Sequence, residues 1–208
     1  MLMKRKHPIP HRIQGFSLVE VMVAVVVICV GLLGIAKMQA MALSNTNMSR
    51  QRSLAAIEAA SIAASMHSNR QYWAGAIVTP FSVSISGKPA VVASSDGGLQ
   101  AQTTADLTNL TACIGNNTGA VACNNPSDLA AFDLARWWVT SVSVQLPNPT
   151  ATVTCPLVPA GNAAPISCTV QISWTEKALA MNAEEAAQEK AVGPSLSEQP
   201  IFTLYVEP

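Results

Sequence analysis

Four cysteines in the second half of the chain have the clearest potential for chemistry. Cys113, Cys123, Cys155 and Cys168 are even in number, and four cysteines allow three disulfide connectivities. Pairing sequence neighbours gives the shortest loops, so we expect Cys113–Cys123 and Cys155–Cys168 bridges that stabilise a small, loop-rich domain in an oxidising compartment. Zinc binding is the alternative, but no CxxC occurs and His67 is the only histidine beyond the N-terminal region, so we expect no metal site.

The residue types needed for catalysis are sparse. A Ser-His-Asp hydrolase would have to use His67, which lies near Ser65 and Ser68 in an expected helix, where a solvated histidine is the ordinary interpretation. The chain has no P-loop, GxGxxG or EF-hand pattern. Three glutamates are more typical of a solvated helical face than of an acid pair: Glu184, Glu185 and Glu189. We therefore expect neither an enzyme nor a cofactor.

One ionisable carboxylate, Glu20, lies in an otherwise apolar run. Residues 16–36 number 21, enough to span the hydrocarbon core of a bilayer as a helix. A charge in such a helix costs about 2.5–3.5 kcal/mol on insertion scales, so Glu20 needs a partner. If the chain is cut between Gly15 and Phe16, the new α-amine of Phe16, on the same or an adjoining subunit, can pair with Glu20 and set the register of packed helices. A glutamate that reaches lipid headgroups is the alternative.

Charge is distributed unevenly along a chain whose net charge is zero. Four Lys or Arg residues and no acid precede the apolar run. Such a basic flank stays in the cytoplasm, so the remainder is expected to cross the membrane. That remainder carries eight Lys or Arg against twelve Asp or Glu, which argues against direct binding of nucleic acid.

Two simpler interpretations of the N-terminus compete with cleavage after Gly15. In the first, the apolar run is a secretory signal peptide cut after Ala40-Met41-Ala42, but the run is longer than usual and contains a glutamate. In the second, the run is a plain membrane anchor, which accounts for its length but not for Glu20.

The helical signal extends well beyond the apolar run. Residues 37–70 contain no Pro or Gly and are rich in good helix formers, so we predict one continuous helix over residues 16 to about 69. Its second half should be amphipathic, with an apolar face marked by four residues: Leu43, Ile57, Ala60 and Ala64.

The rest of the chain has mostly β and loop character. Alternating patterns predict strands at 81–85, 150–155, 168–175 and 200–207, and the second and third of these should form a hairpin. Residues 94–127 have loop composition, with turns at Asp96-Gly97-Gly98 and Asn116-Asn117. Ser127 is the expected cap of a helix over 128–138, and Val142, Val144 and Leu146 alternate like a strand. Residues 177–192 are expected to be helical or mobile. Three tryptophans are expected in the core: Trp137, Trp138 and Trp174.

The N-terminal features together match a known motif. A basic leader, then Gly15, Phe16 and Ser17-Leu18-Val19-Glu20, with the acid fifth after the cut, resembles the class III signal of type IV pilins and pseudopilins. The resemblance implies cleavage after Gly15 by a prepilin peptidase, N-methylation of Phe16, and Glu20 as the assembly carboxylate. It also implies storage in the inner-membrane lipid and packing with other minor and major pilins through the N-terminal helices.

The resemblance also implies an architecture. The fold would be α+β, with the long N-terminal helix packed on a small antiparallel sheet. The expected divisions are a leader at 1–15, a transmembrane half-helix at 16–36, an amphipathic half-helix at 37–72 and a periplasmic or extracellular head at 73–208.

A narrower resemblance rests on shorter segments. Residues 30–36 (VGLLGIA) and 133–137 (DLARW), with Leu146-Pro147 and the strand ending Ser173-Trp174, are similar to the minor pilin family called type IV pilus modification protein PilV. That family implies a non-catalytic subunit that primes the pilus or sits at its tip and so supports adhesion and twitching motility. A minor pseudopilin of a type II secretion system, or a membrane-anchored periplasmic binding protein, is the alternative.

Overall fold

The computed structural model describes residues 15–75, 80–110, 113, 123, 125–156, 166–176 and 199–208. By its internal contacts the chain divides into two units, Met1–Leu43 and Ser44–Pro208, and each is described by itself. Some of the expectations concern residues outside these ranges. They are the turn at Asn116-Asn117, the helical or mobile segment 177–192, and the glutamates Glu184, Glu185 and Glu189.

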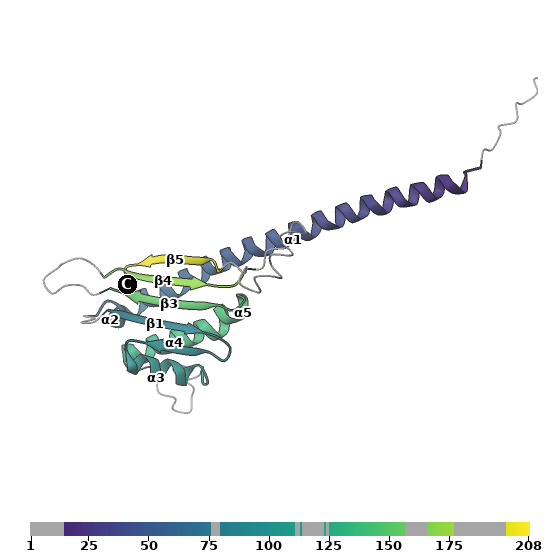
Figure 1. Ribbon diagram of the computed structural model, residues 1–208. Coiled ribbons are helices and arrows are strands. Elements are labelled where there is room, and N and C mark those ends of the chain that lie inside the picture. The colour runs from purple at the N-terminus through teal and green to yellow at the C-terminus, as the bar shows by residue number, and fades with distance from the viewer. Residues whose placement is uncertain are drawn as a thin grey trace, which may run out of the picture. The chain divides into compact units, whose positions relative to one another are not determined.

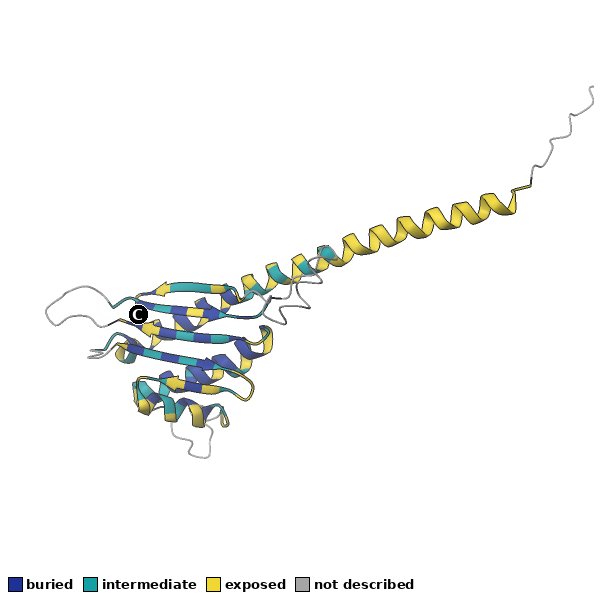
Figure 2. Ribbon diagram, viewed as in Figure 1, coloured by how far each residue is buried: buried dark blue, intermediate teal, exposed yellow. Residues whose placement is uncertain are grey.

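A single helix, α1 (Leu18–Ser68, 51 residues), confirms the long N-terminal helix expected from the sequence. Its residues from Leu18 to Ala40 are all exposed, as the unbroken yellow of its first part shows (Figure 2). Within the described residues, α1 is the one helix long and apolar enough to cross a membrane, by length and composition alone.

The second half of α1 buries a different face from the one expected. The buried apolar residues are Ala55, Ala59, Ile62, Ala63 and Met66. Ile57 is 61% exposed, and Leu43, Ala60 and Ala64 are exposed as well, so the predicted apolar face was wrong. The physical reason is that alanines occur all round this helix. The side that packs is therefore decided by the larger Ile62 and Met66, which the alanine spacing does not reveal.

Five antiparallel strands form one sheet in the order β2-β1-β3-β4-β5 (Figure 1). The strands are β1 (Phe81–Ser86), β2 (Val91–Ser94), β3 (Thr150–Cys155), β4 (Cys168–Ser173) and β5 (Ile201–Val206). The four strands predicted from alternation are confirmed, and β2, a four-residue edge strand, was missed. The long helix and antiparallel sheet confirm the α+β fold class.

The β3–β4 hairpin has the register that its alternation predicts. Val153 lies opposite Val170 and Ala151 opposite Ile172, and all four side chains are buried on one face of the sheet. The structure pairs Cys155 with Cys168 in a disulfide at the turn-proximal ends of the two strands, and it also pairs Cys113 with Cys123.

Helix α3 (Gly97–Asp106) occupies a region predicted to be a loop, so that prediction was wrong. Asp96 starts the helix, because its Oδ1 accepts hydrogen bonds from the backbone N–H groups of Gly98 (2.9 Å) and Leu99 (3.1 Å). Its Oδ2 accepts a further hydrogen bond from the Tyr72 hydroxyl at 2.9 Å, next to the short helix α2 (Arg70–Trp73). Burial raises the pKa of the Tyr72 phenol, and the hydrogen bond and the charge of Asp96 raise it further. Asp96 is therefore a helix cap that also ties α2 to α3.

Helix α4 (Pro126–Trp137) begins earlier than predicted. Its cap is Asn125, whose Oδ1 accepts from the Asp128 N–H at 2.9 Å, with Pro126 in the first turn. Ser127, the expected cap, instead donates its hydroxyl to the same Asn125 oxygen.

The helix continues where a strand was predicted. A π-helical segment, η1 (Trp138–Val142), and α5 (Ser143–Gln145) follow α4 directly. Trp138 and Val142, four residues apart, are both buried, whereas Val144 is 70% exposed. The strand prediction was wrong because burial of one helical face outweighs the β preference of the valines.

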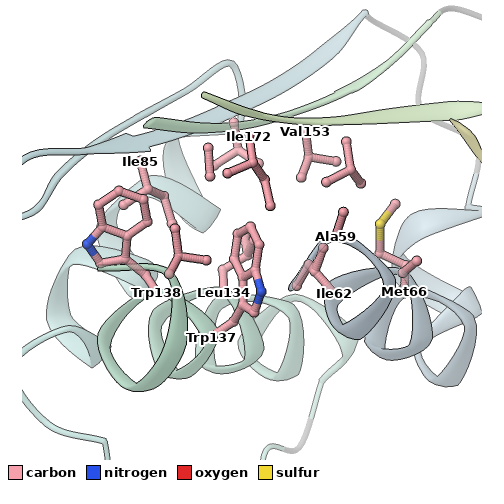
Figure 3. Packing of buried hydrophobic residues seen from close by; sticks show 14 of the residues in the cluster. Ala59, Ile62, Met66, Ile85, Leu134, Trp137, Trp138, Val153 and Ile172 are labelled. Atoms are coloured by element: carbon pink, nitrogen blue, oxygen red, sulfur yellow. The ribbon is translucent and has the colours of Figure 1, made fainter. Parts of the chain in front are cut away.

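The core lies between the sheet and two helices on one of its faces (Figure 3). Ala59, Ile62 and Met66 of α1 and Leu134 of α4 point toward Ile85, Val153 and Ile172 of the sheet. Trp137, Trp138 and Trp174 are all buried, which confirms them as core residues.

Candidate assembly site at the N-terminus

The residues around the expected cut lie directly before α1. The backbone N–H of Val21 donates to the Ser17 carbonyl at 3.2 Å, so helical hydrogen bonding starts at Ser17. Phe16, one residue earlier, is 84% exposed. A cut between Gly15 and Phe16 would therefore leave a free amine about one residue from the helix start.

Glu20 lies in the first turn of α1 and is exposed. A carboxylate is favoured in a first turn, because the unpaired N–H groups there carry partial positive charge. At a rise of about 1.5 Å per residue, four residues separate Glu20 from Phe16 by about 6 Å along the helix axis. An amine at Phe16 thus lies within reach of the Glu20 carboxylate of its own chain, and the exposure of both leaves them open to a neighbouring chain.

Contacts among the described residues do not explain why three positions of the Met1–Leu43 unit are glycine. A Cβ added at Gly15, Gly31 or Gly34 would meet no atom within 4 Å. Packing of the described residues therefore does not require glycine at these positions.

The histidine and the two serines considered for catalysis lie at the end of α1. His67 is exposed in the last turn of α1, and the Ser68 hydroxyl donates to the Ser65 carbonyl at 2.8 Å. Within the part of the chain that the structure describes, no group of three or more His, Cys, Asp or Glu residues could hold a metal ion.

Two buried glutamates, one in α1 and one just beyond β4, hold elements of the fold together. Glu176, just beyond β4, accepts from Arg52 of α1 through both carboxylate oxygens (2.9 and 3.1 Å) and from the Trp174 indole N–H (3.2 Å). Glu58 of α1 accepts from the Gln145 side chain at 3.0 Å, and its backbone carbonyl accepts from the Trp137 indole at 3.0 Å. Because these partners satisfy buried carboxylates, the two residues fasten α1 to the sheet and to the α4–α5 segment. Sequence reasoning missed both glutamates, since neither belongs to a motif.

Asp106 is buried at the end of α3, and its Oδ2 atom has no hydrogen-bond partner among the residues that the structure describes. Burial raises the pKa of this carboxyl, the charge of Asp128 raises it further, and a hydrogen bond with Gln102 opposes both. A folded-state pKa above the unfolded one means that the protonated form favours folding. The contribution to stability is present below the unfolded pKa, about 3.9, and is lost as pH rises through the folded pKa.

We therefore expect Asp106→Asn to flatten the pH dependence of stability. The free energy of unfolding of the unsubstituted chain should fall more steeply than that of the variant as pH rises above about 4, because only the unsubstituted chain must ionise this carboxyl. Urea unfolding at a series of pH values measures the difference, with exposed Glu207→Gln as the control. An equal slope in the Asp106→Asn variant would contradict the expectation.

Comparison with protein families gives one match. The model of the prokaryotic N-terminal methylation motif matches residues 10–36, the segment that contains Gly15, Phe16, Glu20 and the first part of α1. Comparison with the curated proteins and with the solved structures finds no match. The motif, the apolar start of α1 and the antiparallel sheet together support a type IV pilin-like or pseudopilin protein, a class whose members are generally structural and not catalytic.

Proposed function

We propose that the chain is a non-catalytic minor pilin of the type IV pilus, of the PilV kind, which helps to prime pilus assembly or sits at the tip. The observation that carries the proposal is the methylation motif placed at the start of an apolar helix whose surface is exposed from Leu18 to Ala40. A helix that exposes apolar residues on every side needs lipid or other helices around it. Both surroundings are available to a subunit that is stored in a membrane and then assembled.

The proposed mechanism begins with a cut by a prepilin peptidase between Gly15 and Phe16, followed by N-methylation of Phe16. The cut creates a positive charge at the Phe16 nitrogen. Glu20 of a neighbouring subunit is the partner for that charge, since an unpaired carboxylate in an apolar bundle is penalised. The ion pair would select one register among helices whose apolar surfaces can otherwise slide.

In the proposed arrangement, residues 16–36 anchor the subunit in the inner membrane and the head lies first in the periplasm and then on the pilus. Its partners are the peptidase and the N-terminal helices of other minor and major pilins. Adhesion and twitching motility would follow from the whole pilus. The head's disulfides suit an oxidising compartment outside the cytoplasm.

A minor pseudopilin of a type II secretion system is the second candidate, because the N-terminal motif serves both classes. The resemblance of residues 30–36 to PilV and the cysteine pairs favour the pilus. Genes for pilus assembly, as opposed to secretion, beside the gene for this chain would support the first candidate.

Mass spectrometry of the mature N-terminus tests the proposal most directly. We expect a chain that starts at Phe16 and carries one methyl group on its amine. A chain that starts at Met1, or at Leu43 as signal-peptide cleavage after Ala42 would give, contradicts the proposal.

The open space around the glycines supplies a matched pair of variants for the same measurement. A Cβ added at Gly15 or at Gly31 meets no atom of the described residues within 4 Å. We expect Gly15→Val to block the cut and Gly31→Val to leave it unchanged, because the peptidase would read only the first position. Equal cleavage of the two variants would argue against Gly15 as the recognised residue.

A further inference from the structure

Two buried polar side chains lie on one face of helix α3. Thr103 is 0% exposed and Asp106 is 2% exposed. The Oγ1 atom of Thr103 and the Oδ2 atom of Asp106 both lack a hydrogen-bond partner among the residues that the structure describes. Because the two residues are three positions apart, they are neighbours on the helix surface, with Cβ atoms about 5–6 Å apart. Buried polar atoms are normally satisfied, so two such oxygens side by side point to a bound ligand.

A second carboxylate lies close to this pair on the neighbouring helix. Helices α3 and α4 pack side by side (Figure 1). Asp128, in the first turn of α4, is near enough for its negative charge to act on the Asp106 carboxyl. The same carboxyl makes a side-chain hydrogen bond with Gln102, and this bond engages Oδ1, since Oδ2 has no partner in the described part of the chain. Gln102 therefore orients the Asp106 carboxyl while Oδ2 stays available to a ligand.

The charge and the atom type of this cluster indicate which ligand fits. Thr103, Asp106 and Asp128 present oxygen atoms only, and two of the three side chains are carboxylates. A buried carboxylate needs a cation or hydrogen-bond donors to compensate its charge, whereas the charge that acts on Asp106 here is also negative. Ca²⁺ binds oxygen ligands at about 2.3–2.6 Å in flexible geometry, whereas Mg²⁺ requires a near-ideal octahedron and Zn²⁺ favours nitrogen and sulfur. The cluster therefore fits calcium better than either of the other ions.

We propose that Oδ2 of Asp106, Oγ1 of Thr103 and the carboxylate of Asp128 bind one calcium ion between α3 and α4, with water as the remaining ligands. The set has two carboxylates and a hydroxyl, so it is smaller than the groups of three or more His, Cys, Asp or Glu residues considered above. Few charged ligands mean modest affinity, and the dissociation constant should lie in the range of extracellular modules, about 10⁻⁴–10⁻³ M.

The expected role of the ion is to hold two helices of the head together. It neutralises two carboxylates that otherwise repel each other, and it satisfies the two buried oxygens of α3 at the same time. Because the site forms only when α3 and α4 are folded against each other, calcium stabilises the folded head by mass action. The pH series described above for Asp106 has to be measured in EDTA, so that this carboxyl has no bound cation.

Thermal unfolding of the full chain in detergent tests the site. The midpoint in about 10 mM CaCl₂ should exceed the midpoint in EDTA by about 3–10 °C, the shift expected at 10 to 100 times the dissociation constant. Asp106→Asn and Thr103→Val each keep the shape of the side chain and remove one ligand, so each should lose most of the shift. Glu207→Gln, which changes an exposed carboxylate outside the site, is the matched control and should keep the full shift.

Two further measurements separate a specific site from a general effect of salt. MgCl₂ at the same concentration should give a much smaller shift, and titration calorimetry with CaCl₂ should show about one ion bound per chain. No shift in calcium, an equal shift in magnesium, or a full calcium shift in both Asp106→Asn and Thr103→Val overturns the proposal. None of these results bears on processing at Gly15, so the calcium site and the proposed function stand or fall separately.

Discussion

Glu20→Gln should leave the chain inserted in the membrane but excluded from filaments. The amide keeps the size of the side chain and removes its charge, so the proposed ion pair with the Phe16 amine of a neighbour is lost. Removing a charge from the apolar segment also favours insertion, by at most about 2.5–3.5 kcal/mol on insertion scales and less near the membrane edge. Insertion and assembly should therefore change in opposite directions.

Fractionation of membranes and sheared pili measures both quantities in one preparation. Glu20→Asp is the control, because it keeps the charge on a shorter side chain and should retain part of the assembly. Normal amounts of the Glu20→Gln chain in pili would mean that Glu20 is only a residue of the membrane edge, and the assembly role would have to be abandoned.

Trp138→Ala should destabilise the head more than any other single truncation considered. Trp138 is 1% exposed and lies under the sheet near Ile85 (Figure 3). Truncating a buried tryptophan removes its apolar contacts and leaves a cavity, at a cost of about 3–5 kcal/mol. That is a large part of the total of about 5–15 kcal/mol that holds a typical domain folded.

Urea unfolding of the full chain in detergent, followed by the fluorescence of the remaining tryptophans, measures the loss. Val142→Ala and Val144→Ala form a matched pair for the same segment. Helical η1 and α5 bury Val142 and expose Val144, so only the first should cost stability. Equal losses from the two valines would instead fit the strand suggested by their alternation.

The parts of the fold that the sequence predicted are those with a strong local signal. Helix α1 could be predicted from the apolar run and from the absence of Pro and Gly in residues 37–70. Alternation in 150–155 and 168–175 is sufficient for the β3–β4 hairpin, because one face of each strand is buried against the same core.

The elements that sequence reasoning missed depend on contacts made far along the chain. Helix α3 contains Gly97, Gly98 and two threonines, which are poor helix formers, and Leu99 and Thr103 are placed by packing. The cap at Asp96 and the Asn125-Pro126 start of α4 were available signals that turn and loop composition obscured.

The residues of the candidate site form a local motif, so the sequence can indicate them without knowledge of the fold, and their roles stay a prediction. Gly15, Phe16 and Glu20 lie within six residues, and the family match covers them. What the sequence could not reveal is which face of α1 packs on the head, or that Glu58 and Glu176 fasten it there. Those contacts join residues separated by 79 to 124 positions.

The Cys155–Cys168 disulfide has a practical consequence for protein engineering. Cross-strand pairs from Thr150 to Thr154 set the register of β3 and β4, and the disulfide closes the pair at its end. Sheet registry is thereby independent of how much chain links the two cysteines. An epitope or affinity tag inserted between the two cysteines would therefore be carried on the head without any change to the N-terminal motif or to β5.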